Sequence, residues 1–197
     1  MKTIFLSLLV FVSLNVFALP TATVKVLKGK VQFNGKEIKQ SDVIKENGLI
    51  TTSPRSFVKI EVADWNSAIV IGPASSMKID LSSPDVEKKY EFLGGVCRWK
   101  SLVTKSEGKK GKIFTKEVSV GVRGTDFLLT RNEHLGESEI IVFDGLVLFS
   151  NLADQNDSAE IKQGQWGGVG GRYGEKIGKI IDLPPTALRH YTRFLEL

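Results

Sequence analysis

The sequence predicts an all-β fold built of short strands, with one short helix near its C-terminal end. Apolar and polar residues alternate with a period of two through most of the chain, as they do in half-buried strands. Turn-forming pairs such as Asn34-Gly35 and Gly72-Pro73 interrupt this alternation at short intervals. No long helical stripe separates the strands. Periodicity alone does not choose between a sandwich, a solenoid and a closed barrel.

The start of the chain differs from the rest. Lys2 is the only charged residue before an apolar run from Ile4 to Phe17, and Val16 and Ala18 take the −3 and −1 positions of a cleavage site before Leu19. A charged start, a short apolar run and a small residue at its end are typical of a secretory signal peptide. The run is shorter than the roughly 20 residues of a spanning helix, although an uncleaved anchor is the alternative.

Composition limits the remaining possibilities. The chain has 197 residues, enough for one domain with an ordinary core. Its net charge of +5 becomes +4 when Lys2 leaves with the signal peptide. A single cysteine excludes an intramolecular disulfide and a multi-thiolate zinc site, and we expect Cys97 to be a small buried apolar residue. We therefore expect an exported protein, periplasmic or secreted.

The strands follow from the alternation in chain order. Residues 23–33 alternate, but the parity of the apolar residues changes around Gly29, where we expect a bulge or a turn. Three further alternating runs cover residues 58–62, 69–71 and 77–79. Each run is short, which fits a fold made of many brief strands.

The second half adds two stronger signals. Residues 118–122 alternate, whereas residues 140–143 are apolar at every position, so we expect that strand to be buried on both faces. Asp144-Gly145 is followed at once by the apolar run Leu146–Phe149, which predicts a tight hairpin.

Two segments depart from the strand pattern. Residues 104–112 are polar and rich in lysine, which predicts a solvated hairpin tip. Pro184-Pro185 precede Leu188, Tyr191 and Leu195, whose spacing predicts a short amphipathic helix entered through proline. We expect this helix to dock on the β core, with a partner-binding tail as the alternative.

No catalytic motif is recognisable. The chain lacks a serine-hydrolase elbow, a zinc-binding H-E-x-x-H helix and a phosphate-binding P-loop. The glycine-rich residues 167–174 resemble a dinucleotide loop, but Tyr173 occupies the position of its last glycine. We therefore expect no enzymatic activity, no catalytic residue, no metal and no cofactor. Nucleic-acid binding is also not expected, because the lysines between Lys25 and Lys39 lack an aromatic platform.

The motifs taken together resemble the FecR-type domain, named for the ferric-citrate sensing regulator of bacterial envelopes. The most specific segment, residues 118–127, resembles the family signature V-x-V-R-G-T-x-F. Weaker matches follow the family order at residues 29–35, 41–44, 49–60, 63–67, 75–79, 93–96, 142–147 and 162–165. The resemblance spans about residues 29–166.

This resemblance implies a fold of stacked short antiparallel strands, solenoid-like or a twisted sandwich, rather than a closed barrel. It divides the chain into a signal peptide (1–18), a FecR-like domain (19–182) and a C-terminal helical tail (183–197). We interpret its motif residues as structural and leave binding residues unassigned. They are Val122, Arg123, Gly124, Thr125, Phe127, Asp144, Gly145, Gly164 and Gln165.

The signature segment also has a physical interpretation. Val118–Val122 and Phe127–Leu129 have opposite parity, so one residue must be absorbed between them if both sets face the core. We expect a bulge at Gly124, with Arg123 pointing outward beside it. A ligand site at Arg123, Gly124 and Thr125 is the alternative.

The expected function is that of a non-enzymatic exported envelope protein, a protein-interaction or signalling module whose partner is another envelope protein. Regulators of this family carry a cytoplasmic sigma-factor-binding segment and a membrane helix, whereas here the domain follows the expected signal peptide directly. Sigma-factor control by this chain alone is therefore not implied, and no transmembrane anchor is expected after cleavage. The alternative is a structural or ligand-binding component that makes peripheral contact with glycan or anionic lipid through the lysines of residues 105–112.

Overall fold

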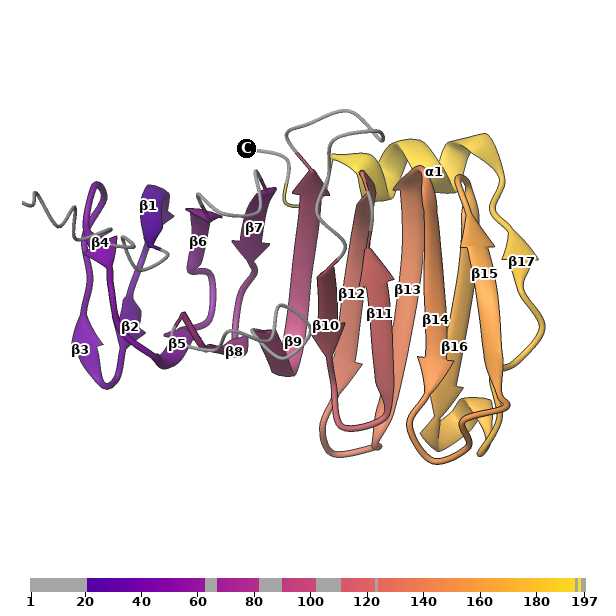
Figure 1. Cartoon of the computed structure of the whole chain (residues 1–197). Coiled ribbons are helices and arrows are strands. Elements are labelled where there is room, and N and C mark those ends of the chain that lie inside the picture. Colours follow the sequence, from indigo (N-terminus) through magenta and orange to yellow (C-terminus); the bar gives the residue numbers. More distant parts are fainter. Residues whose placement is uncertain are drawn as a thin grey trace, which may run out of the picture.

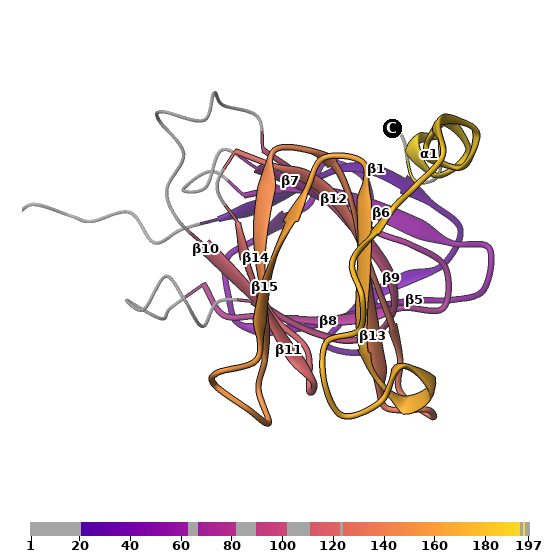
Figure 2. The same cartoon turned by 90° about the vertical axis from the view of Figure 1, so that its right-hand side faces the viewer.

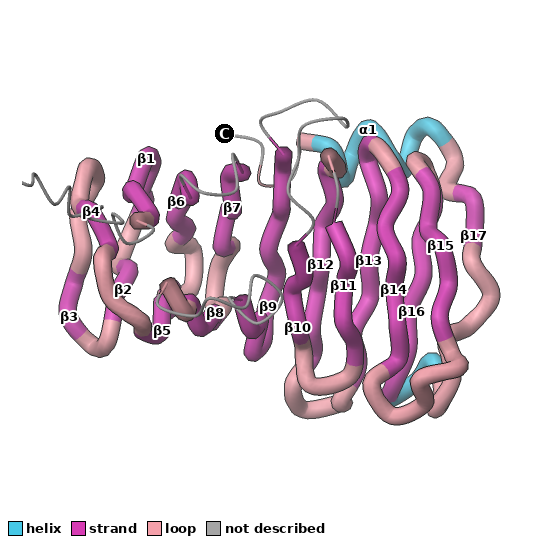
Figure 3. The backbone as a smooth tube through the Cα atoms, in the orientation of Figure 1, coloured by secondary structure: helices cyan, strands magenta, loops and turns pink. Residues whose placement is uncertain are grey.

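The computed structural model describes residues 21–62, 67–81, 90–101, 111–122, 124–193 and 195. Its described part is mostly strand, with one α-helix near the C-terminal end, so the all-β class and the short C-terminal helix are confirmed (Figures 1 and 3). The elements are β1 (Ala22–Lys28), β2 (Val31–Phe33), β3 (Lys36–Glu37), β4 (Val43–Ile44), β5 (Gly48–Thr52), β6 (Phe57–Val62), β7 (Ser67–Ile71), β8 (Ser76–Ile79), β9 (Tyr90–Ser101), β10 (Gly111–Phe114), β11 (Val118–Val122), β12 (Asp126–Asn132), β13 (Glu137–Asp144), β14 (Leu146–Asn151), β15 (Ser158–Lys162), β16 (Gln165–Gly170), the 3-10 helix η3 (Gly171–Tyr173), β17 (Ile181–Asp182) and α1 (Pro185–Thr192).

The strands form two facing layers that share the long strand β9. Layer A runs β4, β1, β6, β7, the second half of β9, β12, β13, β16 and β17. Layer B runs β3, β2, β5, β8, the first half of β9, β10, β11, β14 and β15. All these neighbours are antiparallel except β9 and β10, which are parallel. Figure 2 looks along the stack and shows the two layers facing each other.

The chain builds the stack by placing successive hairpins in alternate layers. β10 and β11 pair in layer B, β12 and β13 in layer A, β14 and β15 in layer B, and β16 and β17 in layer A. Each crossing between hairpins therefore moves the chain to the opposite layer. This arrangement is the expected stack of short strands in a twisted sandwich.

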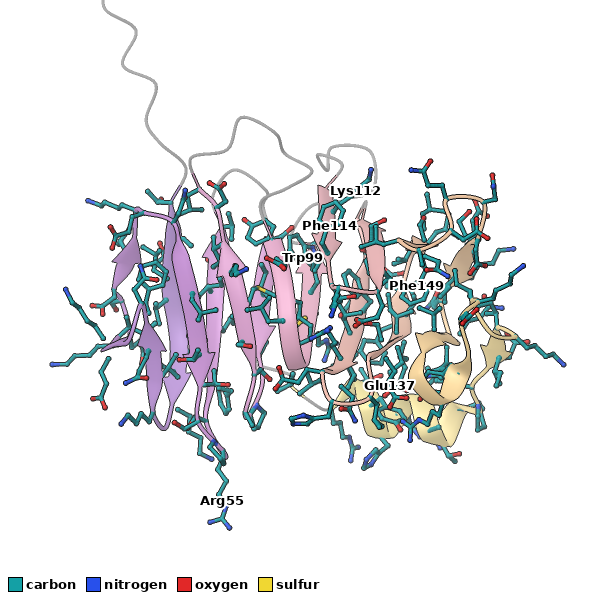
Figure 4. All side chains as sticks on the ribbon, turned by 90° about the horizontal axis from the view of Figure 1, so that it is seen from below. Arg55, Trp99, Lys112, Phe114, Glu137 and Phe149 are labelled. Atoms are coloured by element: carbon teal, nitrogen blue, oxygen red, sulfur yellow. The ribbon has the colours of Figure 1, made fainter. Side chains whose placement is uncertain are left out.

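The core lies between the layers and is made by the inward residues of each strand. Its largest fully buried side chains include Trp99 of β9, Phe127 of β12 and Phe149 of β14, and Figure 4 labels the first and last of these. Burying a side chain of this size stabilises the fold by about 1.5–3 kcal/mol. Cys97 is fully buried beside Trp99, as expected, and this burial raises the pKa of its thiol.

The parity changes predicted from the sequence are produced mainly by crossings between layers. At Gly29 the chain leaves β1 in layer A and enters β2 in layer B, which confirms a turn there. The expectation of a bulge at Gly124 within one continuous strand is wrong. Gly124 lies between two strands of different layers, β11 in layer B and β12 in layer A. Val120 and Phe127 both reach the core, because a layer change reverses which strand face is inward. The register irregularity nearby places an extra residue, Phe143, on β13.

The hairpin predicted at Asp144-Gly145 is also wrong. β13 pairs with β12 and β16 in layer A, whereas β14 pairs with β11 and β15 in layer B. Asp144-Gly145 therefore turns the chain from one layer to the other. Of the segments discussed above, residues 1–18, residues 104–110 and Arg123 lie outside the described residues.

Candidate functional site

Most of the family-motif residues lie where the chain crosses between layers. Gly124, Gly145 and Gly164 sit in three such crossings and have φ angles of 58°, 86° and 82°. An L-residue with a side chain rarely adopts these angles, whereas glycine does so without a steric penalty. We call the edge formed by residues 124–125, 144–145 and 164–165 the corner edge.

Neighbouring crossings pack tightly along the corner edge. A Cβ atom on Gly145 would lie 2.9 Å from Thr125 Cγ2 and 3.0 Å from the Gly124 carbonyl oxygen. Thr125 is buried, and its carbonyl accepts a hydrogen bond of 2.9 Å from the Ser101 amide of β9. Gly145 is therefore needed both for its backbone angle and for its lack of a side chain.

The other motif residues hold this geometry. The Gln165 side-chain oxygen accepts a hydrogen bond of 2.9 Å from the Lys162 amide, and its Nε2 donates one of 2.9 Å to Asp182. Phe127 lies in the core, Asp144 is exposed, and Val122 ends β11. These contacts favour the structural interpretation of the motif.

The outer face of layer A carries a mainly apolar row beside the corner edge. Cross-strand pairing aligns Val70 of β7, Arg98 of β9, Leu128 of β12, Ile141 of β13 and Trp166 of β16. We call these five residues the covered row. Val70, Leu128 and Ile141 are buried although they point away from the core, which confirms burial of the 140–143 strand on both faces.

Helix α1 lies against part of this row, where Tyr191 lines a groove together with Leu128, Ile141 and Trp166. It follows β17 and runs back along the edge of the sandwich where β13 and β15 end (Figure 1). Its inward side is formed by Ala187, Leu188 and Thr192, which are half-buried, whereas no residue of α1 is fully buried. The expectation that the C-terminal helix docks on the β domain is confirmed, and the helix lies on the outer face of a layer.

Arg98 holds the C-terminal end of α1. Its Nε and Nη2 donate hydrogen bonds of 2.8 and 2.9 Å to the two carboxylate oxygens of Asp126. Its Nη1 donates one of 2.6 Å to the Thr192 carbonyl, at the end of the helix where the backbone dipole is negative. The guanidinium also lies 4.7 Å from the centre of the Phe143 ring. One buried side chain therefore joins β9, β12, β13 and α1.

A groove of about 300 Å³ remains between α1 and the covered row. Apolar side chains dominate its lining, which consists of Leu128, Thr130, Glu139, Ile141, Trp166, Ile181, Leu183 and Tyr191. Glu139 accepts hydrogen bonds of 3.2 Å from Trp166 Nε1 and 2.8 Å from the Tyr173 hydroxyl. Burial and this hydrogen bond raise the pKa of Tyr173. The carboxylate is therefore already occupied by two donors.

A second cleft, of about 570 Å³, is lined by residues of the β14–β15 loop and by Gly170 and Glu175, which flank η3. The β14–β15 loop and η3 lie at the edge opposite α1 (Figure 2). Two residues that line this cleft, Glu117 and Arg131, are joined by hydrogen bonds of 2.8 Å from Nε and from Nη2. Ser138 donates another of 2.8 Å to Glu117, and Arg131 Nη1 donates to the Leu93 carbonyl. The charged groups of Glu117 and Arg131 are therefore both hydrogen-bonded within the protein.

The environment of Glu117 has opposing effects on its pKa. Burial raises the pKa of this carboxyl group, but hydrogen bonds from Arg131, Ser138 and Thr115 and the charge of Arg131 lower it by more, so the result lies below 4.5. The group is therefore kept ionised as a structural anion. An acid–base catalyst at neutral pH would need the opposite shift.

Neither a metal-binding cluster nor a membrane-spanning helix occurs in the described part of the chain. No three His, Cys, Asp or Glu side chains of the described residues are grouped so that they could hold a metal ion. Within the same residues, no helix has the length and apolar character needed to cross a membrane.

The sequence interpretation missed Arg98 and Asp126. Arg98 stands between two core residues, Cys97 and Trp99, so alternation predicts an exposed side chain. A signal was nevertheless present, because the apolar residues Leu128 and Ile141 also occupy outward positions and require a cover. The resemblance directed attention to the corner edge, which lies beside this cover.

The sequence matches a known protein family. The sequence profile described as FecR protein matches residues 48–148, which is more than half of the chain. The chain belongs to the FecR family. This FecR match includes β5 to β13, both crossings next to Thr125 and Gly145, and the Arg98–Asp126 pair. A search of curated proteins returned no match.

Solved structures share the fold of this FecR protein. A proposed anti-sigma factor from Parabacteroides distasonis matches in two crystal structures, with TM-scores of 0.60 and 0.61 and 14% sequence identity. The alignments cover 74% and 75% of this chain. This chain spans 65% of the length of the matched chain in each case.

Proposed function

We propose that this FecR-family chain is an exported, non-enzymatic signalling module of the bacterial envelope that binds another protein through its α1-bearing edge. The observation that carries the proposal is the covered row, a mainly apolar strip on the outer face of a β layer. Outer faces of sandwiches are usually polar, and buried apolar residues there mark a surface that has evolved to be covered. α1 lies against part of it and presents its own outward side to the surroundings.

Two further observations favour binding over chemistry. Glu139 in one cleft, and the Glu117–Arg131 pair in the other, are hydrogen-bonded to partners within the protein. The pKa of Glu117 is lowered, whereas an acid catalyst at neutral pH needs a raised pKa. Export is supported by the charged start, apolar run and small-residue exit of residues 1–18.

The interaction can be tested by site-specific photocrosslinking in the native host. A benzophenone amino acid would replace Thr186 on the exposed side of α1, and Glu160 on the exposed side of β15 would serve as the matched control. We expect a discrete adduct with one envelope protein from position 186 and none from position 160. Adducts of equal yield from both positions, or from neither, would overturn binding through α1.

Export needs a separate measurement. Mass spectrometry of the purified protein should show a mature N-terminus at Leu19, and fractionation should place it outside the cytoplasm. Replacing Ala18 with Arg should block cleavage, because the −1 position accepts small residues. An intact Met1 in a cytoplasmic fraction would contradict export without affecting the crosslinking result.

A further inference from the structure

The outward face of α1 carries a cluster of basic residues. Thr186, Arg189, His190 and Arg193 line a shallow depression of about 430 Å³, and all four are exposed. Residues three and four positions apart share one face of a helix, which places these side chains together. The opposite face carries Ala187, Leu188 and Thr192, which point toward layer A.

These cations lack counterions within the described part of the chain. Arg98 pairs with Asp126, Arg131 with Glu117, and Arg172 with Glu137, whereas no described carboxylate pairs with Arg189 or Arg193. Basic residues in the last turn also favour the helix dipole. The helix dipole favours a cation near the helix end, whichever face of the helix carries it. It therefore does not account for the position of Arg189 and Arg193 on the same face as Thr186.

We propose that this face, formed by Thr186, Arg189, His190 and Arg193, is the docking site for an acidic segment of a partner protein. The two guanidinium groups can each bind a carboxylate through two parallel hydrogen bonds. The Thr186 hydroxyl and the His190 ring add donors at the same face. The inference rests on the proposed protein-binding function and specifies the chemistry of the partner.

An acidic peptide fits this face better than a lipid surface. Amphipathic helices that bind membranes insert their apolar side, and stable attachment requires apolar burial besides a few cations. In α1 the apolar side is directed at layer A, where the groove lining includes Tyr191 and Arg98 holds Thr192. The exposed side offers charge and hydrogen bonds, which suit the carboxylates of Asp and Glu.

The test uses the mature full chain, labelled with ¹⁵N, and a synthetic peptide of eight residues that alternates Glu with Ser. Titration at low salt should shift the amide signals of residues 186–193, and the affinity should fall as salt is added. The double variant Arg189→Gln/Arg193→Gln should bind the peptide at least tenfold more weakly. The control Lys28→Gln/Lys36→Gln removes the same charge from exposed positions in the N-terminal half and should leave the affinity within twofold.

Several results would overturn the inference. Equal affinity in the two double variants would show that the peptide responds to overall charge alone. Binding to vesicles of phosphatidylcholine and phosphatidylglycerol at 7:3, without binding to the peptide, would assign the face to lipid. If the adduct at position 186 persists in Arg189→Gln/Arg193→Gln, the proposed function stands and the acidic segment is excluded. If no adduct forms in the otherwise unaltered chain, the proposed function fails, whatever the peptide titration gives.

Discussion

Arg98 and Asp126 form a two-point ion pair on the outer face of layer A, with nitrogen–oxygen distances of 2.8 and 2.9 Å. Only 5% of the Arg98 side chain and 12% of the Asp126 side chain are exposed. The remaining terminal nitrogen of Arg98 binds the Thr192 carbonyl, 94 positions further along the chain. The pair therefore couples the packing of the sheet to the position of α1.

Replacing Arg98 with Met should lower the free energy of unfolding by about 3 kcal/mol, because the buried Asp126 would keep only the exposed Lys100, 3.8 Å away, as a counterion. It should also loosen α1, since the Thr192 carbonyl loses its donor. Chemical denaturation would measure the first effect. Hydrogen exchange of the amides of residues 188–192 would measure the second, and we expect faster exchange than in the unaltered protein.

The double variant Arg98→Met/Asp126→Leu provides the control. It removes both charges together, so most of the lost stability should return, while the helix still lacks its donor. Arg98→Lys should be intermediate, because one ammonium group cannot reproduce the two-point geometry. Equal stability of Arg98→Met and the double variant would show that the buried charge of Asp126 is not the cause.

Replacing Glu117 with Gln should lower the free energy of unfolding by about 3 kcal/mol near neutral pH, because Arg131 would remain buried without a full counterion. The native pKa of Glu117 lies below its ordinary value of 4.5, despite the opposing effect of burial. A lowered native pKa stabilises the fold at pH values above the unfolded pKa, and this stabilisation is lost as pH falls through the native pKa. The stability difference between the two proteins should therefore be constant above pH 4.5 and shrink below it. Denaturation curves across pH 2–8 test this, and a difference that grows on acidification would contradict it.

Replacing Gly145 with Ala should cost about 2–3 kcal/mol. The residue must hold a φ of +86°, and its new Cβ would press on Thr125 and on the Gly124 carbonyl. Gly136 is the matched control, because its φ is +62° and no atom lies within 4 Å of a Cβ there. Gly136→Ala should show only the backbone penalty, about 1–2 kcal/mol. Equal losses in the two variants, measured by thermal or chemical unfolding, would exclude a packing role for Gly145.

The strand content of this fold was predictable because alternation is a local property. A strand that buries one face needs an apolar residue at every second position, and this pattern is visible in residues 58–62 and 118–122. The glycines of the turns were predictable for the same reason, since a positive φ is a demand on one residue. The expected short C-terminal helix needed only its proline start and the spacing of Leu188 and Tyr191.

The layer of each strand was not predictable from these signals. Asp144-Gly145 reverses the chain with a positive φ in a hairpin and in a crossing alike, and only long-range pairing distinguishes the two. Arg98 was missed for a related reason, because its burial depends on Asp126 and Thr192, 28 and 94 positions away. The family resemblance located the corner edge, whereas the proposed function of the surface beside it depends on α1, which lies beyond the matched residues 48–148.

Cys97 should resist thiol reagents in the native protein. Its side chain is fully buried, and burial raises the pKa of the thiol, so the reactive thiolate is scarce and inaccessible. Labelling by 5,5′-dithiobis(2-nitrobenzoate) should therefore occur only after unfolding, and denaturant should accelerate it in parallel with the loss of structure. A Cys97→Ala/Ser158→Cys variant carries an exposed thiol on β15 and should react at once in native buffer. Arg98→Met should label faster than the unaltered protein, because lower stability raises the unfolded population from which Cys97 reacts. Rapid labelling of the unaltered protein without denaturant would show that β9 opens locally while the rest of the sandwich stays folded.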